Sequence, residues 1–234
     1  MATILKDKNG QQRSALIVWG GWPGHEPQKV AELFAGFLRE RGFAVAVSDT
    51  LDSFLDSDSL ARLSLIVLNW TMGEITDAQL NPVIDAVRGG VGLAGCHGGL
   101  CDAFRMATEW QFMTGGQWVS HPGNDGVPYT VRVTDPSHCI TQGAPETFTL
   151  VSEQYYLHTD PANHVLAVTE FPVADGPHVP NGRVDMPVMW TKRYGEGRVF
   201  YHSLGHHPDI FADRYVQSLT VRGFLWAAKA DDLL

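Results

Sequence analysis

The sequence predicts an α/β fold in which a mostly parallel central sheet carries helices on both faces. Three observations lead to this prediction. Short apolar runs end at glycine or polar residues, as strands buried on both faces do. Stretches with apolar residues at three- and four-residue spacing, typical of amphipathic helices, stand between these runs. Their alternation in the first half of the 234 residues is typical of a parallel sheet.

The first half contains four predicted strands and three predicted helices. The strands cover residues 14–19, 43–47, 63–68 and 92–95. The helices cover residues 26–41, 76–88 and 100–113. Gly42 ends the first helix as a C-cap, and Thr76 begins the second as an N-cap, although Pro82 argues against a regular early part. In such a sheet, ligands gather at the carboxyl ends of the strands.

The second half is less regular. Alternating apolar residues predict strands at residues 129–134, 147–151, 164–169, 186–194 and 198–203. The last two flank a Gly-Glu-Gly turn and are expected to form a hairpin. A surface loop at residues 172–182 and a final helix from about Tyr215 complete the chain. Without a repeat or a linker, residues 1–234 are expected to form one domain.

Composition excludes several classes of function. With 17 Lys and Arg against 26 Asp and Glu, the net charge of -9 argues against binding to nucleic acid or to an anionic membrane. Residues 1–13 contain no apolar signal segment, and no long apolar run follows, so we expect a cytoplasmic protein. The three cysteines, Cys96, Cys101 and Cys139, form no CxxC pair and are expected to be reduced thiols.

The most informative segment is VGLAGCHGG at residues 91–99. A strand that turns into a helix through closely spaced glycines has the pattern of a nucleophile elbow, with His97 at the apex and Cys96 pointing back toward the sheet. An imidazole there suits metal binding or acid–base chemistry. Two alternatives stay open at this point: His97 is a structural residue beside packing glycines, or Cys96 is the nucleophile.

Two further histidines are expected at the same sheet edge. His25 follows the first strand, and His206 lies in SLGHHPD after the last strand, next to His207. Three histidines from three strand-end loops suit a catalytic site for Zn, Mn, Ni or Fe. The topology supports this interpretation, whereas no HExxH-type spacing does. The alternative for His25 is a solvated residue, with Glu26 complementing the positive end of a helix.

The best carboxylate candidate is Glu153, because the aromatic residues of SEQYY suggest a partly buried acid with raised proton affinity. His121 lies in a turn, where it can also be structural or part of a rim. Aromatic faces beside polar groups suit sugars, although core packing explains any one of them equally well. The candidate substrate-binding residues are Trp22, Trp70, Tyr155 and His158.

Six segments, taken together and in order, resemble the ThuA-like proteins, a family named for trehalose utilization. They are GGWPGHEP, AGCHGGLCDAF, GGQWVSHPG, SEQYYL, MPVMWTKRYGEGRVFYHSLGHHPDIF and GFLWAAK, and they span nearly the whole chain. The resemblance implies the class I glutamine amidotransferase-like fold, a flavodoxin-like three-layer sandwich. It also implies functional roles for His25, Glu26, His97, His121, Glu153 and His206. The family's usual His-Pro-Ile segment here reads His138, Cys139, Ile140.

The resemblance implies an enzyme that acts on a 3-keto-sugar or 3-keto-glycoside made by a partner sugar 3-dehydrogenase. A divalent metal ion on His25, His97 and His206 would assist isomerisation or cleavage, with Glu153, His97 and His121 as catalytic residues. Glutamine hydrolysis is not expected, because His97 replaces the amidotransferase cysteine. The alternatives are a non-catalytic sugar-binding or regulatory module, and a cysteine hydrolase. Domains of this superfamily often pair, which leaves a homo-oligomer open.

Overall fold

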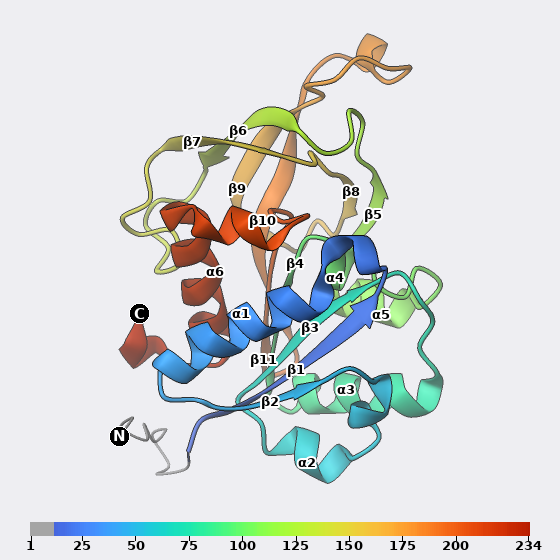
Figure 1. The fold of residues 1–234 in the computed structure, drawn as a ribbon, viewed down its shortest axis with the longest axis vertical. Coiled ribbons are helices and arrows are strands. Elements are labelled where there is room, and N and C mark those ends of the chain that lie inside the picture. The colour runs from blue at the N-terminus through green and yellow to red at the C-terminus, as the bar shows by residue number, and fades with distance from the viewer. Residues whose placement is uncertain (1–11) are drawn as a thin grey trace.

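The computed structural model describes residues 12–234. Residues 1–11 of the segment 1–13 lie outside the described residues. The described chain forms three layers around one large sheet (Figure 1). One face of the sheet is covered by α1 (Pro27–Glu40) and α6 (Arg214–Ala227). The other is covered by α2 (Ser57–Ala61), α3 (Asp77–Arg88) and α5 (Thr108–Thr114). The predicted helices on both faces are confirmed.

The large sheet has nine strands in the order β2-β1-β3-β4-β11-β10-β9-β6-β7. The parallel half consists of β2 (Ala44–Ser48), β1 (Ser14–Gly21), β3 (Leu65–Thr71), β4 (Gly92–Cys96) and β11 (Gly197–His202). The antiparallel half consists of β10 (Val184–Tyr194), β9 (His164–Phe171), β6 (Val127–Val133) and β7 (Thr147–Ser152).

The expectation of a mostly parallel sheet is therefore corrected to a mixed sheet. A tight turn at Gly195 (φ 57°) joins β10 to β11, and such a short connection allows only antiparallel pairing. The strands beyond β10 continue that pattern. A separate two-stranded sheet, β5 (Gly116–Ser120) with β8 (Tyr156–Thr159), was not expected from the sequence.

The strands β1, β3, β4 and β11 are largely buried on both faces, as predicted from their continuous apolar character, whereas the edge strand β2 has no buried residue. Successive residues of β1 point to opposite faces of the sheet, so that Ile17 packs in the core under α1 and α6. Its neighbour Val18 packs in the core under α3. Each helix contributes one apolar side to the core it covers; in α1 this side includes Phe34 and Leu38.

Two helix predictions have different outcomes. The helix α3 runs through Pro82 and begins with a capping box between Thr76 and Gln79, so Thr76 is confirmed as its N-cap. The predicted helix 100–113 is wrong, because it is divided into α4 (Gly98–Cys101) and α5. The chain leaves the helix at Asp102, whose backbone oxygen accepts a hydrogen bond from the Met72 amide.

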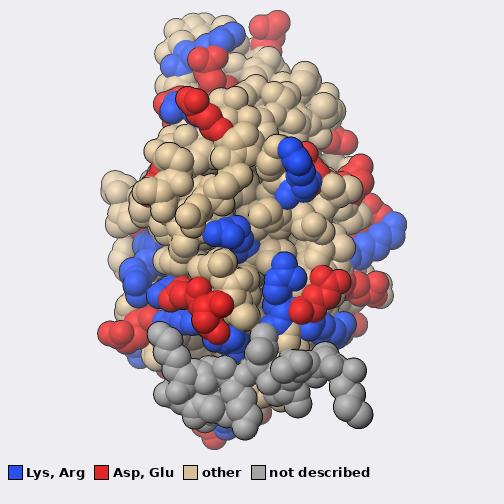
Figure 2. Space-filling view, turned by 90° about the vertical axis from the view of Figure 1, so that its left-hand side faces the viewer, with Lys and Arg blue, Asp and Glu red and all other residues tan. Residues whose placement is uncertain are grey.

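The surface carries no dominant charge on the face drawn in Figure 2, where Lys and Arg are interspersed with Asp and Glu around a broad uncharged area.

The predicted loop 172–182 is confirmed apart from the 3₁₀ turn Val179–Asn181, and it projects from the sheet with its flanking strands β9 and β10 (Figure 1). Within residues 12–234, no helix combines the length and the apolar character that a bilayer crossing needs.

Candidate functional site

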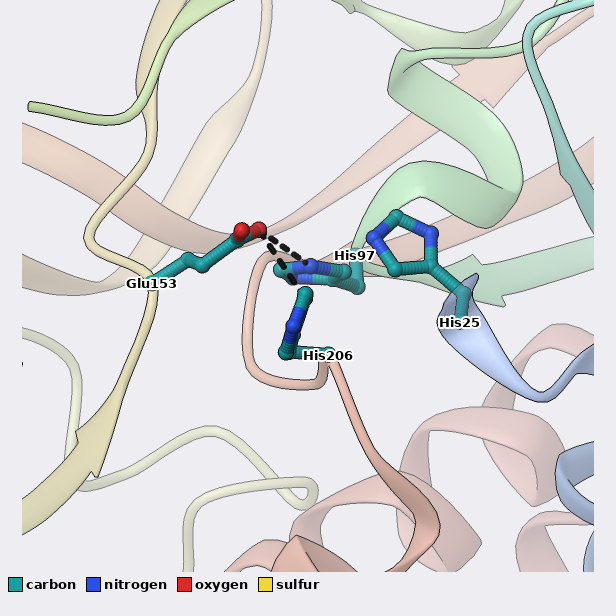
Figure 3. A group of neighbouring side chains, drawn as sticks. All are labelled: His25, His97, Glu153 and His206. Carbon is teal, nitrogen blue, oxygen red and sulfur yellow. Dashed lines mark hydrogen bonds and ion pairs between the residues drawn. The ribbon is translucent and has the colours of Figure 1, made fainter. Parts of the chain in front are cut away.

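Three histidines meet at the carboxyl edge of the parallel half. His25 closes the 3₁₀ turn Pro23–His25 after β1, His97 follows β4, and His206 follows β11. Glu153 follows β7 and approaches from the antiparallel half. One ligand atom of each of these four side chains lies within 4.8 Å of the others. In Figure 3, Glu153 faces His97 and His206, and His25 lies on the far side of His97.

The backbone at His97 has the conformation expected of an elbow. Its φ of 52° and ψ of -128° are unusual for a residue with a side chain, and the surrounding contacts hold them in place. The His97 amide donates to the His202 carbonyl (2.8 Å), and the Tyr201 hydroxyl donates to the His97 carbonyl (2.8 Å). The predicted apex position of His97 is confirmed. Cys96 points into the core, also as expected.

The imidazole of His97 is fixed by three neighbours. Its Nδ1 lies 2.9 Å from the Ser203 carbonyl oxygen, and because a carbonyl only accepts, Nδ1 carries the hydrogen and donates it. Its Nε2 lies 3.0 Å from Oε2 of Glu153. The Tyr155 ring stacks on the imidazole with a centroid separation of 4.1 Å. With Nδ1 occupied, Nε2 is the nitrogen that faces Glu153 and the other histidines.

His25 is held in its neutral form. Its Nδ1 is 2.8 Å from the Thr71 hydroxyl oxygen, and its side chain is buried. Burial, reinforced by nearby His97, lowers the pKa of His25 to about 2. The alternative of a solvated His25 is therefore wrong. Glu26 adopts a positive φ of 47° and pairs with Lys29.

Glu153 connects the cluster to His121. Its Oε2 lies 3.3 Å from Nδ1 of His206 as well as 3.0 Å from His97, and its Oε1 lies 3.1 Å from Nδ1 of His121. Burial by itself raises the pKa of Glu153, but the close approach of His206 and His97 outweighs burial and holds the pKa below its ordinary value. The raised proton affinity expected from the aromatic residues in the sequence is therefore wrong.

His206 reaches the cluster because a glycine precedes it. A Cβ on Gly205 would lie 2.4 Å from the His97 Cβ, so only glycine allows the two loops to approach this closely. The hydroxyl of Ser152 donates to the Gly205 carbonyl (2.5 Å) and joins this loop to the segment before Glu153. Interaction with Glu153 raises the pKa of His206. The segment then forms the 3₁₀ turn Pro208–Ala212 before α6 begins.

The predicted substrate-binding residues lie in different settings. Trp22 is 42% exposed and meets His25 edge to face at 4.7 Å, while Tyr155 is buried on His97. Trp70 packs over Gly20 and Gly73, where any Cβ would collide with its ring. His158 is exposed on β8, and its ring lies beside that of Tyr156. Because side chains alternate between the two faces of a strand, His158 points away from the cluster. The structure thus brings Trp22 and Tyr155 to the cluster.

Several site residues were missed by reasoning from the sequence. Trp118 lies between the Arg105 guanidinium (4.5 Å) and the His121 ring (5.4 Å), and Arg105 pairs with buried Asp102. Asp125 faces the outer side of His206. No pattern in the sequence identifies Asp125, because it belongs to an irregular loop. Trp118 stands beside His121 in GGQWVSHPG and could have been identified from that proximity.

The donor set suits a divalent ion. Three imidazoles and one carboxylate are the ligands that Zn and related metals accept, and the Ser203 carbonyl behind His97 is a typical second-sphere partner. A cavity of about 10 Å³ among His25, His97 and His206 has room for one small species. The Nδ1 atom of His206 is buried without an aligned hydrogen bond. These residues therefore fit a metal ion.

The cysteines are poorly suited to nucleophilic catalysis. Burial raises the pKa of both Cys96 and Cys101, so neither thiol forms a thiolate readily. All three cysteines are free, as their number and spacing predicted. The geometry thus argues against the cysteine hydrolase.

Comparison with known proteins identifies the family and the fold. Residues 14–227 match the family model ThuA, described as trehalose utilisation, whereas no curated protein matches the chain. A ThuA-like protein from Bacteroides uniformis ATCC 8492 is 19% identical with a TM-score of 0.75, over 92% of this chain and 91% of its own. A cytoplasmic protein from Salmonella typhimurium LT2 is 15% identical with a TM-score of 0.64, over 94% and 99% of the two chains.

The fold also occurs within larger proteins. A β-galactosidase from Bacillus circulans sp. alkalophilus is 11% identical with a TM-score of 0.61, and the match covers 94% of this chain but 31% of the galactosidase. At these identities the solved structures establish the fold alone, whereas the family model covers nearly all of the described chain. The resemblance seen in the sequence motifs is confirmed, and the protein belongs to the ThuA family.

Proposed function

We propose that this protein is a metal-assisted enzyme of carbohydrate metabolism that acts on a 3-keto-sugar or 3-keto-glycoside. The observation that carries the proposal is the convergence of His25, His97, His206 and Glu153 at one edge of the sheet. The family description, trehalose utilisation, supports a sugar as the substrate class. The net charge of -9 also favours a neutral substrate over a polyanion.

In this proposal His25, His97 and His206 hold the divalent ion, which is Zn, Mn, Ni or Fe. When bound, the ion supplies Lewis-acid polarisation of a substrate carbonyl. The Ser203 carbonyl fixes the ring of His97, and the Thr71 hydroxyl fixes that of His25. Both rings are thus oriented before ligand binding, which lowers the cost of ordering them.

His121 is the proton carrier that we favour. Its Nδ1 faces Glu153, so its Nε2 is left to exchange a proton with the substrate. Burial lowers the pKa of His121, which keeps the ring neutral and able to accept a proton. The Glu153 carboxylate then stabilises the protonated ring, as an acid does behind a catalytic histidine. This chemistry serves both isomerisation and cleavage by elimination.

Aromatic side chains are proposed to orient the sugar. The exposed face of Trp22 beside His25 suits the C–H face of a pyranose, and Tyr155 supports the His97 ring from below. Trp70 and His158 remain candidates for the more distant part of a disaccharide. Trp70 lies on the glycines of the β1 and β3 loops, and His158 lies on β8. Both places would suit a second sugar ring better than the reacting one.

Metal analysis of the purified protein, with a turnover assay on a 3-keto-disaccharide, tests the proposal. We expect about one equivalent of metal in the wild type and a large loss of metal and activity in His97→Gln. His164→Gln is the matched control, because His164 is exposed at the start of β9, in the antiparallel half, where it pairs with Asp135. Unchanged metal content in a folded His97→Gln variant would contradict the ligand assignment.

A second candidate is a non-catalytic sugar-binding or regulatory module. The observation that favours it is that the same fold forms about a third of a β-galactosidase, where it accompanies a sugar-processing enzyme. Calorimetry with a 3-keto-disaccharide, run beside the turnover assay, distinguishes the two. Binding without turnover across all supplied metals would favour the module and argue against the enzyme.

Four further expectations complete the proposal. We infer a flavodoxin-like origin for the parallel half, supported by its strand order β2-β1-β3-β4-β11. A cytoplasmic location is supported by the similar Salmonella protein that is described as cytoplasmic. The proposed substrate class requires a sugar 3-dehydrogenase as the partner enzyme, and a homo-oligomer is testable by sedimentation.

A further inference from the structure

A second group of ligating side chains lies on the outer side of His206. Asp125, His206 and His207 each offer a ligand atom within 4.8 Å of the other two. Oδ2 of Asp125 lies 3.9 Å from Nε2 of His206 and 3.8 Å from Nε2 of His207. This group shares only His206 with the inner cluster and takes no part in the proposed reaction.

The spacing of these atoms favours an ion between them. Separations of 3.8 and 3.9 Å are too long for hydrogen bonds. Two ligands at about 2.0–2.1 Å from a tetrahedral metal lie roughly 3.3 Å apart, so a small inward movement would complete a site. The side chain of Asp125 is 49% exposed and that of His207 is 41% exposed, so solvent reaches the group.

Glu26 provides the second-sphere partner that a metal-binding histidine usually has. Its Oε2 lies 3.5 Å from Nδ1 of His207, on the side of the ring opposite to Asp125. A carboxylate behind Nδ1 favours the tautomer with its hydrogen there, and Nε2 then presents a lone pair to Asp125. Glu26 is itself held by Lys29. This arrangement leaves Nε2 of His207 suited to a cation.

His206 belongs to both groups through different nitrogens. Its Nδ1 faces Glu153 in the inner cluster, and its Nε2 faces Asp125 in the outer group. A neutral imidazole has a lone pair on only one nitrogen. His206 can therefore complete the inner or the outer site, and binding at one weakens binding at the other.

We propose that Asp125, His206 and His207, with Glu26 behind His207, form an outer divalent-cation site that competes with the inner cluster for His206. The competition rests on the proposed function, whereas the outer site by itself does not. Two imidazole nitrogens and one carboxylate oxygen are donors that suit Zn²⁺. Because the outer site is open to solvent and the inner one is buried, excess metal would fill the outer site and withdraw His206 from the inner site.

Calorimetric titration of the metal-free full chain with Zn²⁺ at pH 7 tests the proposal. We expect two binding events in the wild type, a tight inner one and a weaker outer one. His207→Gln and Asp125→Asn each remove the weaker event, and both side chains are exposed enough for the variants to fold. His164→Gln, which alters an exposed histidine–aspartate pair elsewhere, keeps both events.

The inner variant His97→Gln separates the two proposals. If the outer site exists and the inner one does not, His97→Gln leaves binding unchanged and His207→Gln abolishes it. A single event in the wild type that His207→Gln and Asp125→Asn leave intact would overturn the outer site. Glu26→Gln is expected to weaken the outer event roughly tenfold while preserving its stoichiometry. Equal outer affinity in His97→Gln and wild type would overturn the competition for His206.

Discussion

The two halves of the nine-stranded sheet are built on different principles. In the parallel half, β4 is buried at every position and β3 at all but one. In the antiparallel half, β6 and β7 alternate between buried and exposed residues, so only one face is fully covered. The inner strands β3 and β4 are therefore held by apolar packing on both faces, whereas the outer strands β6 and β7 bury one face and leave the other to solvent.

Specific polar contacts are concentrated around β8, β9 and β10. The buried amide of Gln154 donates to the Thr169 hydroxyl and the Glu170 carbonyl, and it accepts from the Val173 amide. Lys192, nearly buried on β10, pairs with Asp160 and donates to the Phe112 carbonyl. These bonds position the segment that carries Glu153.

The candidate site lies where the two halves meet. The parallel half supplies three imidazoles from its strand ends, the antiparallel half supplies the carboxylate of Glu153 after β7, and the segment after β5 of the small sheet supplies His121. Only tertiary contacts, such as that between Ser152 and Gly205, bring these contributions together. Substitutions can therefore change the stability of the scaffold and the chemistry of the site separately. The following predictions use this separation.

The largest effect is expected at the contribution of the antiparallel half. Glu153→Gln keeps the shape of the side chain but removes the charge that His97, His121 and His206 share. We expect kcat/KM on a 3-keto-disaccharide to fall by about a thousandfold. Glu146→Gln, at an exposed carboxylate before β7, is the control and should retain full activity. A Glu153→Gln variant within tenfold of the wild type would remove Glu153 from the reaction.

The next largest effect is expected where two strand-end loops of the parallel half approach each other. In Gly205→Ala the new Cβ would lie 2.4 Å from the His97 Cβ, so the backbone of one loop must move. We expect the free energy of unfolding to fall by about 3 kcal/mol, as overpacking costs in a rigid core. Urea unfolding measures this change, and Zn²⁺ titration of the folded fraction should give weaker binding. A loss below about 0.5 kcal/mol would mean that the loops adapt freely.

Removing a polar contact of the antiparallel half should cost less. Asp160→Asn leaves the Lys192 ammonium partly buried without its counter-charge, and we expect a loss of about 2 kcal/mol at pH 7. The hydrogen bond from Lys192 lowers the pKa of Asp160 below its ordinary value. The stabilisation is therefore present above the unfolded-state pKa, about 4, and is lost as pH falls through the folded-state pKa.

Urea unfolding at pH 7 and at pH 3 checks this sign. The gap between the free energies of unfolding of wild type and Asp160→Asn should narrow at pH 3, because the carboxyl of the unfolded wild type takes up a proton below about pH 4. Replacing both partners, as in Asp160→Asn with Lys192→Met, should recover part of the loss, because no unpaired charge is then buried. A gap that is independent of pH would show that the pair acts only through packing.

The smallest effect is expected in the helices of the scaffold. Gly36 lies inside α1, and a Cβ there would meet no atom within 4 Å. Gly36→Ala should therefore raise the free energy of unfolding by up to about 1 kcal/mol, since alanine favours the helix. Thermal unfolding of this variant beside Gly205→Ala compares an open glycine with a closely packed one. A destabilised Gly36→Ala would contradict the open environment of that position.

Much of the parallel half could be predicted from the sequence. Apolar runs and helical periodicity identified β1, β3, β4, α1 and α3, because burial on both faces leaves a continuous apolar signal. Glycine spacing identified the elbow at His97, since few residues adopt its backbone conformation. The prediction of one helix over residues 100–113 was wrong because the chain leaves the helix at Asp102, where the backbone carbonyl accepts a hydrogen bond from the distant Met72 amide.

The assembly of the site was less predictable. Strand-end topology suggested that His25, His97 and His206 meet, and the structure brings them together. The protonation of Glu153 was predicted with the wrong sign, because burial was inferred from neighbouring aromatics while the histidine contacts were unknown. Asp125 gave no sequence signal, and its proximity to His206 depends on a loop conformation.

The sequence by itself determined the family, the parallel scaffold and the strand-end loops that carry the histidines, because these depend on local patterns of apolar residues and glycine. Only the tertiary structure decided that the sheet is mixed, that Glu153 stays ionised among three imidazoles, and that His206 faces two groups of ligands. These features arise from contacts between residues far apart in the chain, whose electrostatic interactions have no counterpart in local sequence.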